Sequence, residues 1–347
     1  MHLDLQLDAF FLCPIVIFNN VLRKNLVTSI CKHNLSMTFI SVENLTTHYD
    51  TSKGKIHALE DVSFTLEYGE SIGIAGESAC GKSTLGLSLI RMISNGKIVS
   101  GKIIFDGKSF LDIPDSEFDN KYRWKDISMV FQGAMNSLDP VFTIHEQFIE
   151  VLKEHNFKGD AEKTIEDLLK SVNLDKSVLK KFPHELSGGM KQRVIIVMAL
   201  LLKPKFVIAD EPTTALDVLI QAQIINLFKK LKKDGMTLLL ISHDLAVLSE
   251  VSEKIGIMYG GKMVEFGSSR EIFQNPKHPY TIGLLESIPR LHGDKKPKFI
   301  KGTPPDLLNA DNACRFIDRC PEAMDKCKKP PPKISTESGY VLCWLYE

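Results

Sequence analysis

The sequence predicts an α/β fold built around a parallel, doubly wound sheet. Two observations carry this prediction. Between residues 206 and 241, an apolar strand, a helix with one apolar face and a second apolar strand follow one another, and this alternation is typical of parallel sheets. The short apolar strand at 71–75 runs into a glycine-rich loop and then a helix. Open α/β sheets bind their ligands at such turns, beyond the carboxyl ends of the strands.

The remaining elements follow from apolar spacing and from turn residues. Near-alternating apolar residues predict strands, and apolar residues at i, i+3, i+4 and i+7 predict helices with one buried face. Asp106-Gly107 and Gly260-Gly261 each stand between apolar runs, which predicts two hairpins. The predicted elements are strands 39–42, 62–66 and 71–75, a hairpin across 102–110, helices through 165–172 and 194–201, strand 206–209, a helix through 220–231, strand 237–241 and a hairpin across 255–266.

Composition narrows the class of protein. Lys+Arg and Asp+Glu both number 43 in the 347 residues, and a neutral chain is a poor candidate for wrapping nucleic acid. Apolar residues make up 44% and charged residues 25%, which excludes collagen-like, low-complexity and largely disordered chains. The longest apolar run, 9–18, is interrupted by Pro14 and falls short of the roughly 18–20 residues of a membrane span. We expect a cytosolic chain unless a partner holds it at a membrane.

The glycine-rich loop has the pattern G-x-x-x-x-G-K-[ST] of a phosphate-binding P-loop. Successive backbone N–H groups in such a loop point into one concavity, and the following helix adds the positive end of its dipole. Lys82 would reach the β- and γ-phosphates, and the Ser83 hydroxyl would ligate Mg²⁺. We expect nucleotide contacts from the whole loop, which comprises Gly76, Glu77, Ser78, Ala79, Cys80, Gly81, Lys82, Ser83 and Thr84.

Two acidic residues follow the buried strand 206–209. Asp210 would hold Mg²⁺ through its hydration shell, and Glu211 would polarise the attacking water or accept its proton. His243 ends the next strand, where it would donate a hydrogen bond to a γ-phosphate or orient it. Acids after a strand are often solvated and a lone histidine is often structural, so these assignments depend on the P-loop.

A third motif, LSGGMKQ at 186–192, opens a helix. Ser187 is a favourable N-cap, and the bare backbone of Gly188 and Gly189 lets a phosphate approach. A simple capped helix is the alternative interpretation.

Taken together, these motifs resemble the nucleotide-binding subunit of an ABC transporter, and LSGGMKQ resembles the signature sequence of that family. The resemblance covers about residues 38–347. It places Gln132 in the Q-loop, which senses Mg²⁺ and couples to membrane subunits, and Tyr49 where an aromatic ring stacks on adenine. It implies catalytic roles for Glu211, His243 and Gln132, with Gln132 also near Mg²⁺. It further places Ala215-Leu216-Asp217 in the D-loop.

In the family, ATP lies between the P-loop of one subunit and the signature sequence of a second. Ser187, Gly188 and Gly189 would therefore serve the nucleotide of a partner. The family usually has glycine where Ala79 stands, a departure that matters only if this position requires a positive φ. We expect ATP binding to survive it.

The C-terminal part more narrowly resembles the ATPases of oligopeptide, dipeptide and nickel importers. The matching stretches are 275–281 (NPKHPYT), 284–285, 302–305 (GTPP) and 319–321 (RCP), together with four cysteines. Four of the seven cysteines lie within the last 34 residues, and they lack the close C-x₂₋₄-C pairs of structural zinc sites. Relatives with such a tail carry a [4Fe–4S] cluster, and four thiolates can hold one. We expect a structural cluster here, with zinc and unliganded thiols as alternatives, on Cys314, Cys320, Cys327 and Cys343.

The resemblance implies three parts. These are an N-terminal extension at 1–36, an ABC nucleotide-binding domain at 37–267 and a C-terminal metal-binding extension at 268–347. The ABC domain would contain an antiparallel β subdomain and a helical subdomain inserted at about 133–203.

The implied function is ATP hydrolysis that energises uptake of di- and oligopeptides at the cytoplasmic face of the cell membrane. Import of nickel or another small solute, an exporter ATPase and a soluble ABC protein acting on nucleic acid are the alternatives. Implied partners are a second ATPase chain forming a heterodimer, two transmembrane permease subunits and an extracellular solute-binding protein, with no nucleic acid. Implied cofactors are ATP, Mg²⁺ and the [4Fe–4S] cluster.

Overall fold

Residues 38–347 form one compact unit in the computed structural model. The predicted N-terminal extension at 1–36 and Ala215 of the predicted D-loop lie outside the described residues. In the part of the chain that is described, no helix is long and apolar enough to cross a bilayer. The described residues are 38–214, 216–288, 298–308, 310 and 313–347.

The main sheet of the described residues has eight strands in the order β11-β12-β10-β9-β3-β8-β7-β6. The run from β9 to β6 is parallel, which confirms the predicted parallel sheet. Strands β3, β7 and β8 are buried along their whole length, as expected for strands covered on both faces. The bounds are β3 (Ser71–Ala75), β6 (Ile127–Val130), β7 (Phe206–Asp210), β8 (Thr237–Ile241), β9 (Lys254–Tyr259), β10 (Lys262–Ser268), β11 (Lys333–Ser335) and β12 (Tyr340–Leu342).

A second sheet is antiparallel, with the order β2-β1-β4-β5. The predicted strands at 39–42 and 62–66 are parts of two longer strands. The rest of each strand mixes buried residues, such as Leu45 and Leu59, with exposed ones and lacks a continuous apolar alternation. Asp106 and Gly107 both have positive φ, 49° and 74°, as a two-residue hairpin turn requires. The bounds are β1 (Thr38–Thr51), β2 (Gly54–Glu67), β4 (Gly96–Phe105) and β5 (Lys108–Ser109).

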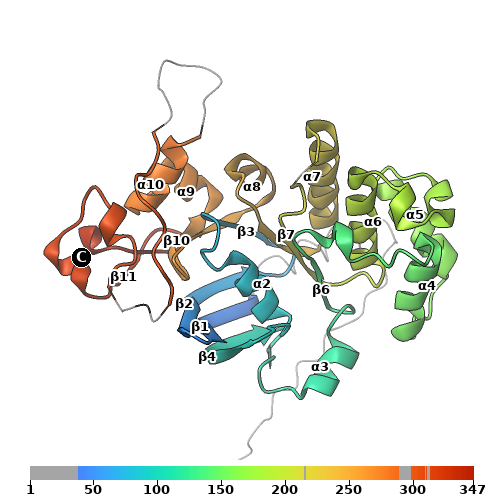
Figure 1. The fold of residues 1–347 in the computed structure, drawn as a ribbon, viewed down its shortest axis with the longest axis horizontal. Helices are drawn as coiled ribbons and strands as arrows, with labels where there is room; N and C mark the ends of the chain where they lie inside the picture. The colour runs from blue at the N-terminus through green and yellow to red at the C-terminus, as the bar shows by residue number, and fades with distance from the viewer. Residues whose placement is uncertain (1–37, 215, 289–297, 309, 311–312) are drawn as a thin grey trace, which may run out of the picture. The chain divides into compact units, whose positions relative to one another are not determined.

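Helices position the loops of both sheets. Helix α2 (Lys82–Leu89) follows the glycine-rich loop and contacts strands of both sheets, so it lies between them (Figure 1). Three helices are inserted between β6 and β7 and gather beside the end of the sheet that β6 forms (Figure 1). They are α4 (Ile144–Glu154), α5 (Ala161–Ser171) and α6 (Gly188–Leu200). The other helices of this part are α3 (Asp115–Lys121), α7 (Val218–Lys233) and α8 (Leu245–Val251).

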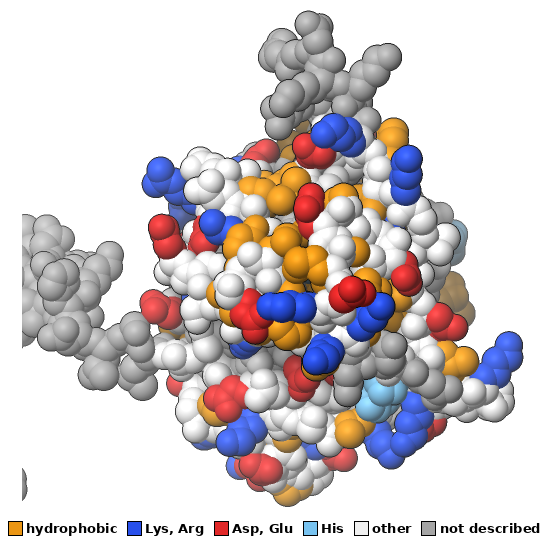
Figure 2. Space-filling model, turned by 90° about the vertical axis from the view of Figure 1, so that its left-hand side faces the viewer, with side chains coloured by type: hydrophobic (Ala, Val, Ile, Leu, Met, Phe, Trp, Pro, Cys, Tyr) orange, Lys and Arg blue, Asp and Glu red, His pale blue; other side chains and the backbone are white. Residues whose placement is uncertain are grey.

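The C-terminal segment, 268–347, packs against the opposite end of the main sheet (Figure 1). It contains α9 (Ser269–Gln274) and α10 (Pro279–Glu286). Its strand β12 pairs with β10, and the Tyr340 hydroxyl donates a hydrogen bond to the Ser63 carbonyl at 2.8 Å. The segment therefore extends the main sheet and also touches the antiparallel sheet. Figure 2 shows this side of the molecule, where hydrophobic side chains lie among basic and acidic ones.

The start of α10 is fixed by a buried polar cluster. The Glu265 carboxylate accepts hydrogen bonds from the backbone N–H groups of Lys277 (2.6 Å) and His278 (3.0 Å). His278 is the N-cap, and its Nδ1 accepts a hydrogen bond from the Tyr280 N–H at 3.0 Å. Burial lowers the pKa of His278 to about 3. The folded protein therefore holds this imidazole neutral.

The neutral His278 predicts a pH dependence of stability. An unfolded chain takes up a proton at this site below about pH 6.5, whereas the folded chain does not until about pH 3. The contribution of the neutral His278 to the free energy of unfolding is therefore complete above pH 6.5. It declines by about 1.4 kcal/mol for each pH unit below that value. In urea unfolding at pH 7.5, 6.5 and 5.5, His278→Asn, which keeps an N-cap side chain, should show a shallower decline than the unaltered chain. Equal declines would contradict the assignment.

Candidate functional site

The loop from β3 to α2 turns at two positions that only glycine can occupy. Gly76 has φ 152°, and a Cβ there would lie 2.2 Å from the Met258 carbonyl oxygen. Gly81 has φ 101°, and a Cβ there would lie 2.3 Å from the Ala58 carbonyl oxygen. The loop is therefore pressed against β9 on one side and β2 on the other. This close approach fixes the direction of its backbone N–H groups.

Ala79 adopts φ 62°, in the left-handed region. An L-residue with a Cβ pays roughly 1–2 kcal/mol for this conformation. Because the φ of residue 79 is positive, replacing the usual glycine by alanine does affect the energy of the loop conformation.

Lys82 folds back over the loop. Its Nζ donates hydrogen bonds to the carbonyl oxygens of Gly76 (2.8 Å) and Glu77 (2.9 Å), and the side chain is buried. The Cys80 thiol lies beneath it, 3.8 Å from Nζ, and burial raises the pKa of this thiol. Cys80 thus fills space under the loop as a neutral side chain.

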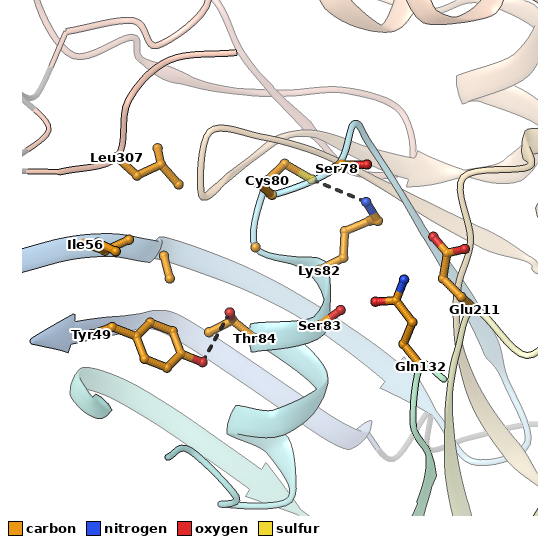
Figure 3. A pocket seen from close by; sticks show the side chains of 13 residues that line it. Tyr49, Ile56, Ser78, Cys80, Lys82, Ser83, Thr84, Gln132, Glu211 and Leu307 are labelled. Carbon is orange, nitrogen blue, oxygen red and sulfur yellow. Dashed lines mark hydrogen bonds between the residues drawn. The ribbon is translucent and has the colours of Figure 1, made fainter. Parts of the chain in front are cut away.

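The cavity beside the loop has a volume of about 300 Å³ and two different ends (Figure 3). Tyr49, Ile56 and Leu307 lie toward one end, and the Tyr49 hydroxyl donates to Thr84 Oγ1 at 3.4 Å. The polar end carries the following residues: Ser78, Lys82, Ser83, Gln132 and Glu211. Such an asymmetry suits a ligand with a flat apolar ring at one end and anionic groups at the other.

Asp210 lies at the carboxyl end of β7, next to Ser83. Its carboxylate is buried, and burial raises its pKa, while a hydrogen bond from the Ser83 hydroxyl acts in the opposite direction. Its Oδ1 is buried and has no hydrogen-bond partner among the described residues. A buried carboxylate oxygen without a partner, beside a hydroxyl, fits a hydrated Mg²⁺, since this cation prefers oxygen ligands and retains water.

Glu211 is held by a different set of contacts. Its φ is 50°, and its backbone N–H donates to the Ile241 carbonyl at 2.9 Å, which attaches it to the end of β8. Its Oε2 accepts a hydrogen bond from Thr214 Oγ1 at 2.6 Å and lies 2.7 Å from Nδ1 of His243. His243 therefore contacts Glu211, and it is not among the residues that line the cavity.

The remaining predicted nucleotide contacts divide into two groups. Gly76 and Glu77 do not line the cavity. The Glu77 side chain instead turns toward the C-terminal segment. Ser187, Gly188 and Gly189 also lie outside it. They form the start of α6, where Ser187 accepts a hydrogen bond from the Met190 N–H at 3.4 Å. Ser187 and Gly188 are exposed.

Three cavity residues, Ile56, Ala58 and Leu307, escaped the sequence analysis. Ile56 comes from β2, and Leu307 comes from the proline-rich segment far along the chain. The Leu307 carbonyl accepts a hydrogen bond from the His57 N–H at 2.9 Å, which places the segment along β2. The only sequence signal near Leu307 was the GTPP stretch at 302–305. That stretch resembles the peptide-importer ATPases, but it has no apolar periodicity from which a contact with β2 could be predicted.

The four tail cysteines share one neighbourhood. None is in a disulfide, and the Cys314 N–H donates to the Cys327 carbonyl at 2.9 Å. Burial raises the pKa of Cys314 to about 11, with smaller contributions from the thiols of Cys327, Cys320 and Cys343. Four thiols are a donor set for an iron–sulfur cluster or zinc. Even so, among the described residues no group of three or more His, Cys, Asp or Glu is arranged as a formed metal site, so a metal-binding extension is not shown.

Two family models match the chain. One, described as ABC transporter, matches residues 59–214 and so includes the P-loop and the signature sequence. The other, described as the C-terminal region of oligopeptide/dipeptide transporters, matches residues 264–327.

Individual proteins match over most of the chain. The oligopeptide transport ATP-binding protein OppD of Escherichia coli (strain K12) is 42% identical over 299 residues, which cover 84% of this chain and 88% of that protein. The dipeptide transport ATP-binding protein DppD of Bacillus subtilis (strain 168) is 42% identical over 320 residues, covering 89% and 95%. A solved dimer of the ATP-binding cassette MJ0796, bound to ADP and Pi, superposes with a TM-score of 0.60 at 30% identity, covering 67% of this chain and 99% of that one. The chain thus belongs to the ABC transporter family, among the ATP-binding proteins of oligopeptide and dipeptide transport.

Proposed function

We propose that this chain binds and hydrolyses ATP to energise the uptake of di- and oligopeptides by an ABC importer. One observation carries the proposal. The similarity to peptide-transport ATP-binding proteins runs through both the ATPase core and the C-terminal region at 264–327. A nickel or other small-solute importer is the alternative within the same family. Uptake of labelled peptides and of nickel is measured in cells that lack the gene. Loss of peptide uptake would support the proposal, and loss of nickel uptake would support the alternative.

The cavity suggests how ATP is bound. The adenine ring stacks on Tyr49, and the triphosphate lies along the N–H groups of the loop with Lys82 at its β- and γ-phosphates. The apolar and polar ends of the cavity (Figure 3) and the anion preference of a helix N-terminus support both assignments.

Bound Mg²⁺ would neutralise charge on the phosphates. Ser83 and Gln132 would hold it directly, and Asp210 would hold it through water. The unpartnered Oδ1 of Asp210 supports this role.

Glu211 orients and polarises the attacking water. Its contacts with Thr214 and His243 restrict the carboxylate to one orientation, which is what a positioned base requires. His243 contacts Glu211 and keeps its carboxylate in place, at the edge of the sheet where a γ-phosphate would bind. The two acids after β7 thus have separate roles: Asp210 acts at the metal ion, and Glu211 acts at the attacking water.

A second ATPase chain completes the site. Ser187, Gly188 and Gly189 lie outside this chain's cavity, and the exposure of Ser187 and Gly188 supports a role for them at a partner's nucleotide. We propose a heterodimer that acts on two permease subunits and receives peptides from an extracellular solute-binding protein. It lies at the cytoplasmic face of the membrane and uses no nucleic acid.

We also propose that Cys314, Cys320, Cys327 and Cys343 hold a structural [4Fe–4S] cluster. The hydrogen bond between the backbones of Cys314 and Cys327 and the free state of all four thiols support the proposal. When bound, the cluster would cross-link a segment that has little core of its own.

The first prediction concerns nucleotide binding. Lys82→Ala removes the ammonium group above the loop, so the Kd for ATP should rise at least about tenfold, equivalent to about 1.4 kcal/mol. Equilibrium titration with a fluorescent ATP analogue measures this. Lys97→Ala, an exposed change in β4 outside the cavity, serves as the control. Unchanged affinity in Lys82→Ala would refute the proposed function.

The second prediction separates binding from hydrolysis. Glu211→Gln keeps the shape of the side chain but removes the base, so ATP turnover should fall about 10²–10⁴-fold while the Kd for ATP changes little. Phosphate release by the complete transporter measures turnover. A turnover equal to that of the unaltered protein would remove Glu211 from its role.

The third prediction concerns the tail cysteines. Protein purified without oxygen should contain about four irons per chain and absorb in the charge-transfer region of iron–sulfur clusters. Cys327→Ser should lower the iron content, whereas Cys80→Ser, a change at another buried thiol, should leave it unaltered. Colourless protein with stoichiometric zinc would contradict the cluster and support the alternative metal.

A further inference from the structure

A salt bridge joins the phosphate-binding loop to the C-terminal segment. Both terminal nitrogens of Arg319 donate to the carboxylate of Glu77, Nη1 to Oε2 at 2.7 Å and Nη2 to Oε1 at 3.0 Å. The two residues are 242 positions apart in the sequence. A two-pronged contact between guanidinium and carboxylate is both strong and directional.

Arg319 is itself held firmly. Its Nη1 also donates to the Tyr259 hydroxyl at 3.1 Å, and its Nε donates to the Lys301 carbonyl at 3.0 Å. The guanidinium lies over the Tyr259 ring, 5.6 Å from the ring centroid, and only 5% of the side chain is exposed. Because these contacts fix the guanidinium before any ligand binds, the position of Glu77 is fixed as well.

The backbone of Glu77 is anchored by the same segment. Its N–H donates to the Tyr280 hydroxyl at 2.9 Å. Tyr280 belongs to α10, is fully buried and packs on Tyr259 with 4.5 Å between ring centroids. Both the side chain and the N–H of Glu77 are thus directed away from the cavity. The following residue, Ser78, lines it.

The charge of Glu77 requires such an arrangement. A carboxylate within a loop that receives a triphosphate repels it, and this repulsion is strong where little water intervenes. Arg319 offsets the charge and keeps the carboxylate turned toward the C-terminal segment. Without Arg319, a free anionic side chain would lie one residue from the cavity wall.

We propose that Arg319 is a positioning residue for ATP binding, which acts by orienting Glu77 and neutralising its charge. The proposal rests on the proposed function, since it assigns a role at the same ATP site. According to this proposal, the C-terminal segment increases the affinity of the loop for ATP. A salt bridge that only docks this segment on the core is the competing explanation.

A double-mutant cycle on the full chain tests the proposal, with a fluorescent ATP analogue as the probe. Arg319→Ala should raise the Kd about five- to tenfold, because it leaves Glu77 uncompensated. Glu77→Gln should change the Kd less than about twofold, and adding Arg319→Ala to Glu77→Gln should cost little more. The defect of Arg319→Ala should also shrink as salt is raised, since salt screens repulsion between charges.

Arg315→Ala is the matched control. Arg315 is an equally buried arginine of the same segment, and it pairs with Glu60 instead of the loop. Its effect on the Kd should be the same with or without Glu77→Gln. If Arg319→Ala does not fold, Arg319→Lys replaces it in the test, because lysine keeps the charge but loses the two-pronged contact. Arg319→Lys should raise the Kd when Glu77 is present and leave it unchanged in the Glu77→Gln background.

Two results would overturn the role of Arg319. One is an unchanged Kd in Arg319→Ala. The other is an equal loss of affinity in Arg319→Ala with and without Glu77→Gln, which would assign the salt bridge to docking alone. Neither result resembles failure of the proposed function, because that failure appears as unchanged ATP affinity in Lys82→Ala.

Discussion

The close packing of one loop between two sheets is the constraint on which the site depends. At Gly76 and Gly81 the loop backbone approaches carbonyl groups of β9 and β2 so closely that no Cβ fits. Loops of the main sheet supply the polar end of the cavity, and the antiparallel sheet supplies its apolar end through Tyr49 and Ile56. Any change in the separation of the two sheets changes the shape of the whole cavity.

The two acids after β7 show how neighbouring groups of the same chemistry acquire different environments. Asp210 is buried beside Ser83, and its pKa is raised by that burial. Glu211 is the next residue, yet its left-handed backbone turns its carboxylate toward Thr214 and His243. One carboxylate thus meets the end of α2, where Mg²⁺ is expected, and the other meets a second strand end. The environment, rather than the residue type, separates their chemistry.

The sequence predicted the parts of the fold and site that short-range patterns encode. The strand, loop and helix around Lys82 are contiguous, and so are β7 and its two acids. Tyr49 and Gln132 came from the resemblance to the ABC family, and the structure places both in the same cavity as Lys82.

What the sequence could not predict depends on distant partners. The pairs Glu77–Arg319 and His57–Leu307 join the core to a proline-rich segment without apolar periodicity. The positive φ of Ala79 likewise had no signal in the residue type, because alanine rarely adopts the left-handed region. The remaining parts of β1 and β2 gave no strand signal because their buried residues, such as Leu45 and Leu59, do not continue the apolar alternation.

The pairing of β12 with β10 also bears on biosynthesis. Strand β10 is complete at residue 268, but β12, which covers its outer edge, begins only at Tyr340. During translation the ATPase core can thus assemble while β10 still presents unpaired backbone groups. An uncovered edge of this kind is a template for pairing with other chains. The nascent protein is protected from such association only after β12 has left the ribosome and paired with β10.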